Sequence, residues 1–216
     1  MKKVLLSILI LLSTSLLHAT NITNINFIKN SSKNGDIFTI QGTLTANLND
    51  NEYMFQDSSG QAKIIIKHFV LKELGNSLLP LNSEITLRIA VNKEIIEHPK
   101  FEAFEITHFN RSPTTASLNT TSLSNILKNA NDHDIFTIKG TIIATTDTLD
   151  NQYQLKDEFG KIIGITVKNF AFKAIDINHF NAEDRVVLRV IYRKDTETNA
   201  TWLEVYKIVE LNNSTF

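Results

Sequence analysis

The chain has 216 residues, with 22 lysine and arginine against 23 aspartate and glutamate side chains, so its formal net charge at pH 7 is −1. Hydrophobic residues make up 42% of it, which is enough for a core in each of two small domains, and there is no cysteine. The balanced charge argues against a protein that grips nucleic acid through a broad basic surface. The missing cysteines exclude disulfides and thiolate chemistry.

The first residues have the pattern of a secretory signal peptide. A basic start, Met1-Lys2-Lys3, precedes the apolar run Val4–Leu12, and Ala19 stands at the expected cleavage site. The run is too short to span a bilayer by itself. We therefore predict that residues 1–19 are removed and that the mature protein is periplasmic or secreted, with no transmembrane span. Its 20 basic and 23 acidic side chains would give it a net charge of −3. The alternative is a membrane anchor formed by Val4–Leu17.

The rest of the chain contains one pattern twice. The segment Asp36–Thr43 returns as Asp134–Thr141 with a single difference, Gln41 against Lys139. Further matches follow in the same order: Asp50–Tyr53 with Asp150–Tyr153, Asp57 and Gly60 with Asp157 and Gly160, Lys67 and Phe69 with Lys168 and Phe170, and Leu87-Arg88 with Leu188-Arg189. A period of about 100 residues is that of a small domain rather than of a solenoid repeat. We predict a tandem duplication with module 1 at residues 26–110, a linker at 111–122 and module 2 at 123–212.

Each module is predicted to contain five strands, with a short helix after the third. In module 1, alternating apolar and polar residues predict strands at Ile37–Ala46, Glu52–Gln56, Lys63–Lys67, Ile85–Asn92 and Phe101–Phe109. Helices are expected at Asn26–Asn34, where Phe27 and Ile28 match Ile126 and Leu127, and at Phe69–Asn76. This order is that of the OB-fold. The predicted fold class is therefore all-β with short helices, as two tandem five-stranded OB-fold barrels.

One motif resembles a known family. The first strand reaches Gly42, and the second strand and its turn read Tyr53-x-Phe55-x-Asp57-x-Ser59-Gly60. This pattern resembles the bacterial OB-fold (BOF) family of YgiW/YdeI-like periplasmic proteins, here as a tandem duplication. The chain departs from the family in strand four, where it has Ile89 and Val190 in place of a glycine. The resemblance implies a noncatalytic binding protein linked to envelope stress tolerance.

The sequence does not predict catalysis or metal binding. It has no cysteine, and no serine lies in a Gly-x-Ser-x-Gly turn, so it lacks an activated nucleophile. The histidines after the leader lack the close pairing of metal ligands: His68, His98, His108, His133 and His179. Asp57 and Asp157 hold the same turn position in separate modules, so we interpret them as turn residues. We predict no enzyme, no cofactor and no metal.

The candidate ligand-binding residues lie on the sheet face opposite the aromatic residues. Phe38, Tyr53 and Phe55 are in phase with the core, so this face lacks the rings that stack on bases in strand-binding OB-folds. It carries instead Gln41, Gln56, Lys67 and Arg88 in module 1, and Lys139, Lys156, Lys168 and Arg189 in module 2. We expect the four cations of module 2 to share one exposed surface that binds an anionic ligand, a sugar or a protein. The alternative for each lysine is a solvated sheet face.

Together these features favour an exported, noncatalytic tandem OB-fold binding or adaptor protein of the envelope, whose polar or anionic ligand or protein partner is unknown. Two alternatives stay open. One is a single-stranded nucleic-acid-binding protein, against which the leader, the charge and the missing stacking aromatics count. The other is a structural spacer in which the two barrels pack together.

Overall fold

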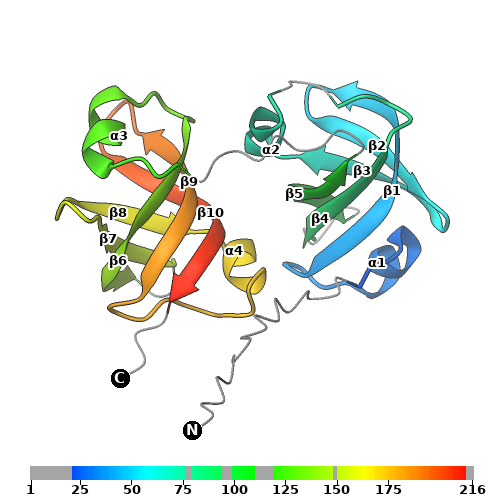
Figure 1. Cartoon of the computed structure of the whole chain (residues 1–216). Coiled ribbons are helices and arrows are strands. Elements are labelled where there is room, and N and C mark those ends of the chain that lie inside the picture. The colour runs from blue at the N-terminus through cyan, green and yellow to red at the C-terminus, as the bar shows by residue number, and fades with distance from the viewer. Residues whose placement is uncertain (1–20, 76–78, 94–98, 110–118, 148–149, 213–216) are drawn as a thin grey trace, which may run out of the picture.

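The computed structural model of the chain describes residues 21–75, 79–93, 99–109, 119–147 and 150–212. They form two closed five-stranded barrels that lie side by side (Figure 1), which confirms the predicted fold class. The leader at 1–19 and most of the linker lie outside the described residues, so export and the domain boundaries stay predictions. Within the described part of the chain, each helix is too short or too polar to cross a membrane.

The first barrel has the strand order β1-β2-β3-β5-β4, closed by pairing of β4 with β1. Its elements are α1 (Ile25–Ser31), β1 (Ile37–Asn49), β2 (Glu52–Asp57), β3 (Gly60–Ile66), α2 (His68–Glu73), β4 (Glu84–Asn92) and β5 (Lys100–Phe109). Strands β3 and β5 run parallel and the other neighbours antiparallel, with α2 connecting β3 to β4. This is the OB-fold arrangement.

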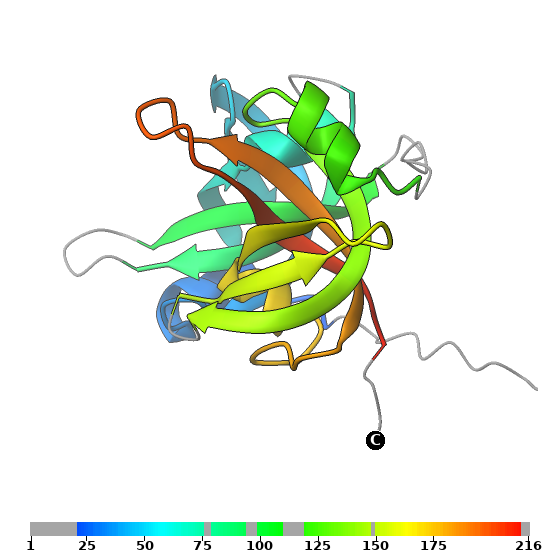
Figure 2. The same cartoon turned by 90° about the vertical axis from the view of Figure 1, so that its left-hand side faces the viewer.

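The second barrel repeats the first, in the order β10-β8-β7-β6-β9. Its elements are α3 (Leu123–Asn129), β6 (Ile135–Asp147), β7 (Gln152–Lys156), β8 (Ile162–Val167), α4 (Asn169–Lys173), β9 (Arg185–Lys194) and β10 (Thr201–Asn212). Figure 2 shows β6 curving around the barrel; it pairs with β7 along one part and with β9 along another. A single long strand therefore closes each barrel.

The expected match between the first helices of the two modules, Phe27 and Ile28 with Ile126 and Leu127, is wrong by one residue. The buried residues of α1 are Ile25 and Ile28, and their counterparts in α3 are Leu123 and Ile126. Phe27 is not part of this match, since its side chain is 53% exposed.

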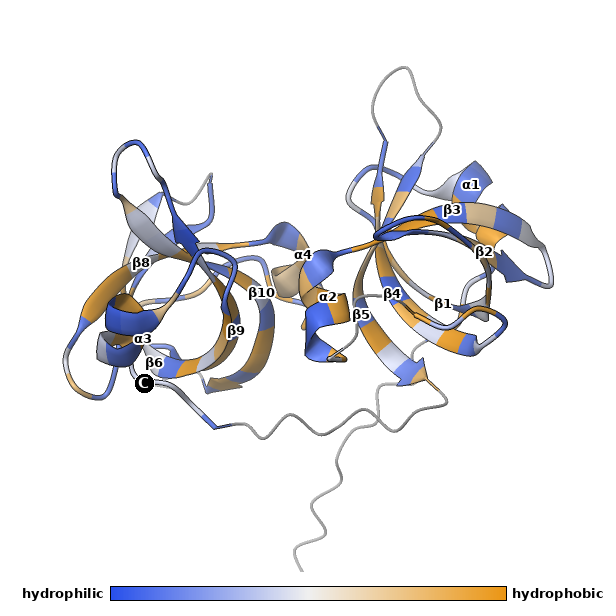
Figure 3. Ribbon diagram, turned by 90° about the horizontal axis from the view of Figure 1, so that it is seen from above, coloured by the Kyte–Doolittle hydropathy of each residue, from blue (hydrophilic) through white to orange (hydrophobic). Residues whose placement is uncertain are grey.

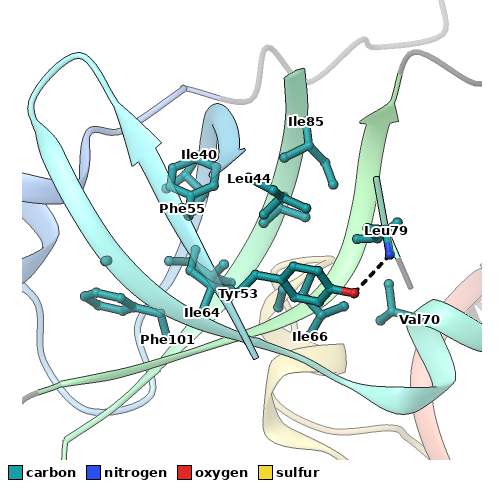
Figure 4. Close-up of a cluster of buried hydrophobic side chains, with 14 of the residues drawn as sticks. Ile40, Leu44, Tyr53, Phe55, Ile64, Ile66, Val70, Leu79, Ile85 and Phe101 are labelled. Carbon is teal, nitrogen blue, oxygen red and sulfur yellow. Dashed lines mark hydrogen bonds between the residues drawn. The ribbon is translucent and has the colours of Figure 1, made fainter. Parts of the chain in front are cut away.

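The core of the first barrel contains the aromatic residues that the alternation assigned to it. Tyr53 and Phe55 are fully buried (Figure 4). The Tyr53 hydroxyl accepts a hydrogen bond of 2.9 Å from the backbone N–H of Leu79, so its polar end is satisfied inside the core. The sheet face that carries Gln41 and Gln56 is thus the outer face, as predicted.

Glycine is required where β1 and β6 pass close to the next strand. A Cβ on Gly42 would lie 2.2 Å from the carbonyl oxygen of Gln56, and one on Gly140 would lie 2.6 Å from that of Lys156. Contacts this short are not tolerated, so both positions exclude a side chain. Packing therefore explains why both modules have glycine at this position.

The repeated aspartates have the structural role predicted for them, and a second one. Asp57 Oδ1 accepts from the backbone N–H groups of Ser59 and Gly60, at 2.7 and 3.0 Å. Its Oδ2 accepts from the N–H of Ile25 at 2.7 Å and so anchors the start of α1. Burial opposes ionisation of Asp57, but these hydrogen bonds, with one from the Ser59 hydroxyl, hold its pKa below the usual value. Asp157 anchors α3 in the same way, through the N–H of Leu123 at 3.1 Å.

Candidate binding cleft between the barrels

The barrels meet through α2 and β5 on one side and α4 and β10 on the other (Figure 3). The ring of Phe69 on α2 packs on Tyr206 of β10, with centroids 4.2 Å apart. The ring of Phe170 on α4 stacks on Phe104 of β5 at 4.5 Å. Phe104 and Tyr206 are buried yet belong to neither barrel core, so it is the opposite barrel that covers them.

Polar contacts reinforce this aromatic contact. The guanidinium of Arg189 donates to Glu73 Oε1 through Nε at 3.0 Å and Nη2 at 2.5 Å, and the Tyr206 hydroxyl donates to the same oxygen. Burial lowers the pKa of Arg189, but the Tyr206 oxygen and the Glu73 carboxylate more than offset this and raise it. Burial raises the pKa of Tyr206, and Glu73 raises it further. At neutral pH Arg189 is therefore a cation and Tyr206 a neutral phenol.

A cleft of about 520 Å³ opens beside this contact. Phe69, Phe170 and Ile191 form the apolar part of its wall. The charged side chains that line it are four cations and two carboxylates, from both barrels: Lys67, Lys72, Lys168, Arg193, Glu102 and Glu204. The wall is thus part aromatic and part charged, with more positive than negative groups.

Two lysines at equivalent positions face the cleft. Lys67 and Lys168 stand just before α2 and α4, and their ammonium groups reach strands β5 and β10 of their own barrels. Lys67 Nζ lies 2.7 Å from Glu102 Oε2, and Lys168 Nζ lies 3.0 Å from Glu204 Oε2. Both lysine side chains remain partly exposed, at 33% and 42%. Ion pairs of this kind contribute about 0–1 kcal/mol, so a bound anion can compete with the glutamates.

The structure places four of the eight predicted site residues at the contact between the barrels. Lys67 and Lys168 line the cleft. Arg88 and Arg189 lie within the contact itself, where Arg88 donates to Glu105 of its own barrel at 3.2 Å and to the carbonyl oxygen of Ala174 of the other barrel at 3.4 Å. The expectation that Arg189 shares an exposed surface with the lysines of its module is therefore wrong, because its side chain is only 16% exposed and is bonded to the other barrel.

The other four lie on the outer faces of the barrels, away from the cleft. Gln41 and Gln56 line a shallow hollow on the first barrel that includes the turn at Asp57. Lys139 lines the corresponding hollow on the second barrel, and Lys156, the counterpart of Gln56, is exposed on β7. A ligand role for any of the eight stays a prediction.

The sequence interpretation missed the aromatic residues Phe104 and Tyr206. Each follows a buried small residue, Ala103 or Val205, so two consecutive positions are buried and the strict alternation fails. The cause is a β-bulge at each site, where the register of β5 with β4 and of β10 with β9 shifts by one residue. A pair of adjacent apolar residues inside an alternating strand was the available signal.

Among the described residues, no group of three histidine, aspartate or glutamate side chains is placed to hold a metal ion. No protein-family model matches the chain, and a search of curated proteins finds no match.

Solved structures that resemble the chain do so at low identity. The hypothetical protein YgiW from E. coli is 17% identical over 41% of this chain and 88% of that one, with a TM-score of 0.35. The Ifi202 HINa domain, solved with a 20-base-pair double-stranded DNA, is 14% identical over 79% and 92%, with a TM-score of 0.29. A replication protein A heterotrimer bound to single-stranded DNA is 11% identical over 90% of this chain and 52% of that one, with a TM-score of 0.32. None of these similarities bears on what the chain binds.

Proposed function

We propose that the chain is an exported, noncatalytic tandem OB-fold binding protein of the cell envelope, and that it holds a small amphipathic anion between its barrels. The observation that carries the proposal is the position of Lys67 and Lys168, one from each barrel, beside Phe69 and Phe170 in one cleft. A ligand with an apolar body and an anionic group would meet the rings with one part and the cations with the other. The cleft volume of about 520 Å³ is within the range of about 300–1,000 Å³ usual for small-molecule sites.

The cleft suits a small molecule better than a nucleic-acid strand. Strand-binding OB-folds offer a row of exposed ring faces on which successive bases stack. Here each of Phe69 and Phe170 already packs on a ring of the other barrel and is half-buried. On the outer sheet faces Gln41 and Lys139 stand in place of aromatic residues, and the exposed ring of Phe159 beside Lys139 comes from a turn and not from a row on a strand.

A fluorescent amphipathic anion, 8-anilinonaphthalene-1-sulfonate, provides the test. We expect one binding site per chain, with affinity reduced about a hundredfold or more in the double variant Lys67→Gln/Lys168→Gln, since each of the two lost charged contacts contributes about 1.5–3 kcal/mol and 1.4 kcal/mol is tenfold. The reverse change, Glu102→Gln/Glu204→Gln, should tighten binding because it removes the competing carboxylates. The neutral probe N-phenyl-1-naphthylamine should bind the wild type and both variants about equally.

The matched control is Lys139→Gln/Lys156→Gln, which removes the same charge from the outer face. It should leave binding of the anion unchanged. Equal weakening by both lysine pairs would mean that net charge, and not the cleft, attracts the probe. If instead a short single-stranded oligonucleotide bound the wild type and lost affinity in the Lys139/Lys156 variant, the nucleic-acid alternative would replace the proposal.

Export is tested separately. The leader pattern predicts a mature protein that begins near Thr20 and is found outside the cytoplasm. Mass spectrometry and cell fractionation decide this, and an intact cytoplasmic form beginning at Met1 would contradict it. The role in envelope stress tolerance, which the YgiW/YdeI-like resemblance implies, predicts that cells lacking the protein are more sensitive to membrane-active compounds than cells that carry it.

A further inference from the structure

The contacts between the barrels repeat when the two modules are exchanged. Phe69 corresponds to Phe170 and Phe104 to Tyr206, so the two ring pairs are the same contact made twice. In such an arrangement position i of the first unit touches position j of the second, and position j of the first touches position i of the second. That is the rule of an isologous, two-fold dimer interface.

Backbone contacts at the ends of α2 and α4 follow the same rule. Lys72 Nζ donates to the carbonyl oxygen of His133 at 3.3 Å, and its counterpart Lys173 donates to the carbonyl oxygen of Gly35, the counterpart of His133.

The two arginines of the contact also reach equivalent positions on the opposite barrel. Arg189 reaches Glu73, and Arg88 reaches the carbonyl oxygen of Ala174 at 3.4 Å; residues 73 and 174 hold equivalent positions. Three independent kinds of contact therefore share one approximate two-fold axis.

One ion pair lies on that axis. Glu105 of β5 and Lys207 of β10 are equivalent positions, and they contact each other, with Nζ 2.5 Å from Oε1. A contact between equivalent positions must sit on the two-fold. Two copies of the first module would bring glutamate against glutamate there, and two copies of the second would bring lysine against lysine. The mixed pair alone brings opposite charges together.

We propose that the inner face of each barrel is a specific dimerisation surface, whose partner is a barrel of the same kind with the opposite charge at the axis position. The two barrels hold each other without the linker, whether they belong to one chain or to two copies. The aromatic pairs supply the attraction, and the Glu105–Lys207 pair selects the mixed combination, as like charges do when they exclude wrong partners at an interface. This inference does not depend on what the cleft binds.

The test starts from the folded full-length chain. A specific protease site is inserted between residues 111 and 118, the folded protein is cut, and the halves are analysed at micromolar concentration by size-exclusion chromatography with light scattering. We expect the wild-type halves to co-elute as a one-to-one complex. Reversal of the axis charge on the second barrel, Lys207→Glu, should weaken the complex about tenfold or more. Adding Glu105→Lys should restore pairing in part, because Glu105 also accepts from Arg88 of its own barrel and that bond is lost.

Separate elution of the wild-type halves would overturn the proposal. A Lys207→Glu complex as tight as the wild-type complex would overturn the role of the axis pair. Thermal unfolding of each uncut variant shows whether its barrels are intact. The double reversal carries both substitutions, and recovery of pairing in it would show that neither substitution prevents folding.

Discussion

The two barrels have the same topology but fill their cores differently. In the first barrel Leu71 and Leu79 pack near Tyr53, whose hydroxyl is hydrogen-bonded to the Leu79 backbone. In the second barrel the equivalent positions hold Phe172 and Phe180, which pack edge-on with Tyr153 and with each other at centroid distances of 5.0–6.1 Å. One fold thus accepts either a hydrogen-bonded tyrosine among aliphatic residues or a cluster of three rings. The same barrel topology therefore forms around two different cores.

The largest expected difference between the barrels concerns the two glycines that exclude a side chain. Gly42→Ala places a methyl group 2.2 Å from a carbonyl oxygen and 2.6 Å from the ring of Phe55. Gly140→Ala meets its nearest backbone oxygen at 2.6 Å. Overpacking costs typically about 1–3 kcal/mol and sometimes more, so we expect about 3 kcal/mol at Gly42 and a smaller loss at Gly140. Urea unfolding measures both, and a larger loss at Gly140 would contradict the distances.

A smaller effect separates the two core tyrosines. Tyr53→Phe leaves the buried N–H of Leu79 without its partner, which costs about 1–3 kcal/mol. The Tyr153 hydroxyl is buried without a well-formed hydrogen bond; burial raises its pKa, and the backbone N–H of Phe180 offsets this only in part. We therefore expect Tyr153→Phe to be close to neutral. Equal losses for the two substitutions, by thermal or urea unfolding, would show that the second barrel also satisfies its tyrosine.

The smallest predicted effect concerns acid. The pKa of Asp57 in the folded protein is lowered, so the stability that its carboxylate contributes is present above the ordinary pKa of aspartate and is lost as the pH falls through the lowered value. The variant Asp57→Asn should be less stable than the wild type at neutral pH by about 1 kcal/mol. That gap should narrow below about pH 4. A gap that stays constant down to pH 2 would mean that the charge of Asp57 does not matter.

The fold was readable from the sequence because it rests on local signals. Alternation in Ile37–Ala46 identified a strand whose inner residues Ile40 and Leu44 are indeed buried, and the repeated aspartate turn marked the next hairpin. The site was not readable in the same way. A count of alternating positions assumes regular strands, and the bulges at Phe104 and Tyr206 break that assumption where the barrels meet.

Arg189 shows the second limit of the sequence. The alternation of inward and outward residues along the strand places Arg189 correctly on the outer face of its own barrel. Glu73 of the other barrel covers that face. The docking of two modules joins residues 116 positions apart in the sequence, and no local pattern encodes it. The repeat of Lys67-x-Phe69 as Lys168-x-Phe170 was visible in the sequence only as part of the duplicated pattern, because without the docking geometry it could not be assigned to a cleft.

If the barrels form one fixed pair with a cleft between them, the distance across the pair has a single value, and measuring it is the sharpest test. Because the chain has no cysteine, spin labels can be attached at Asn30→Cys on α1 and Lys128→Cys on α3, two exposed and equivalent positions. Pulsed electron paramagnetic resonance should give a single narrow distance distribution, which broadens when Phe69→Ala and Phe170→Ala are added. A broad distribution in the labelled protein without those substitutions would mean that the barrels move independently, and would contradict the account.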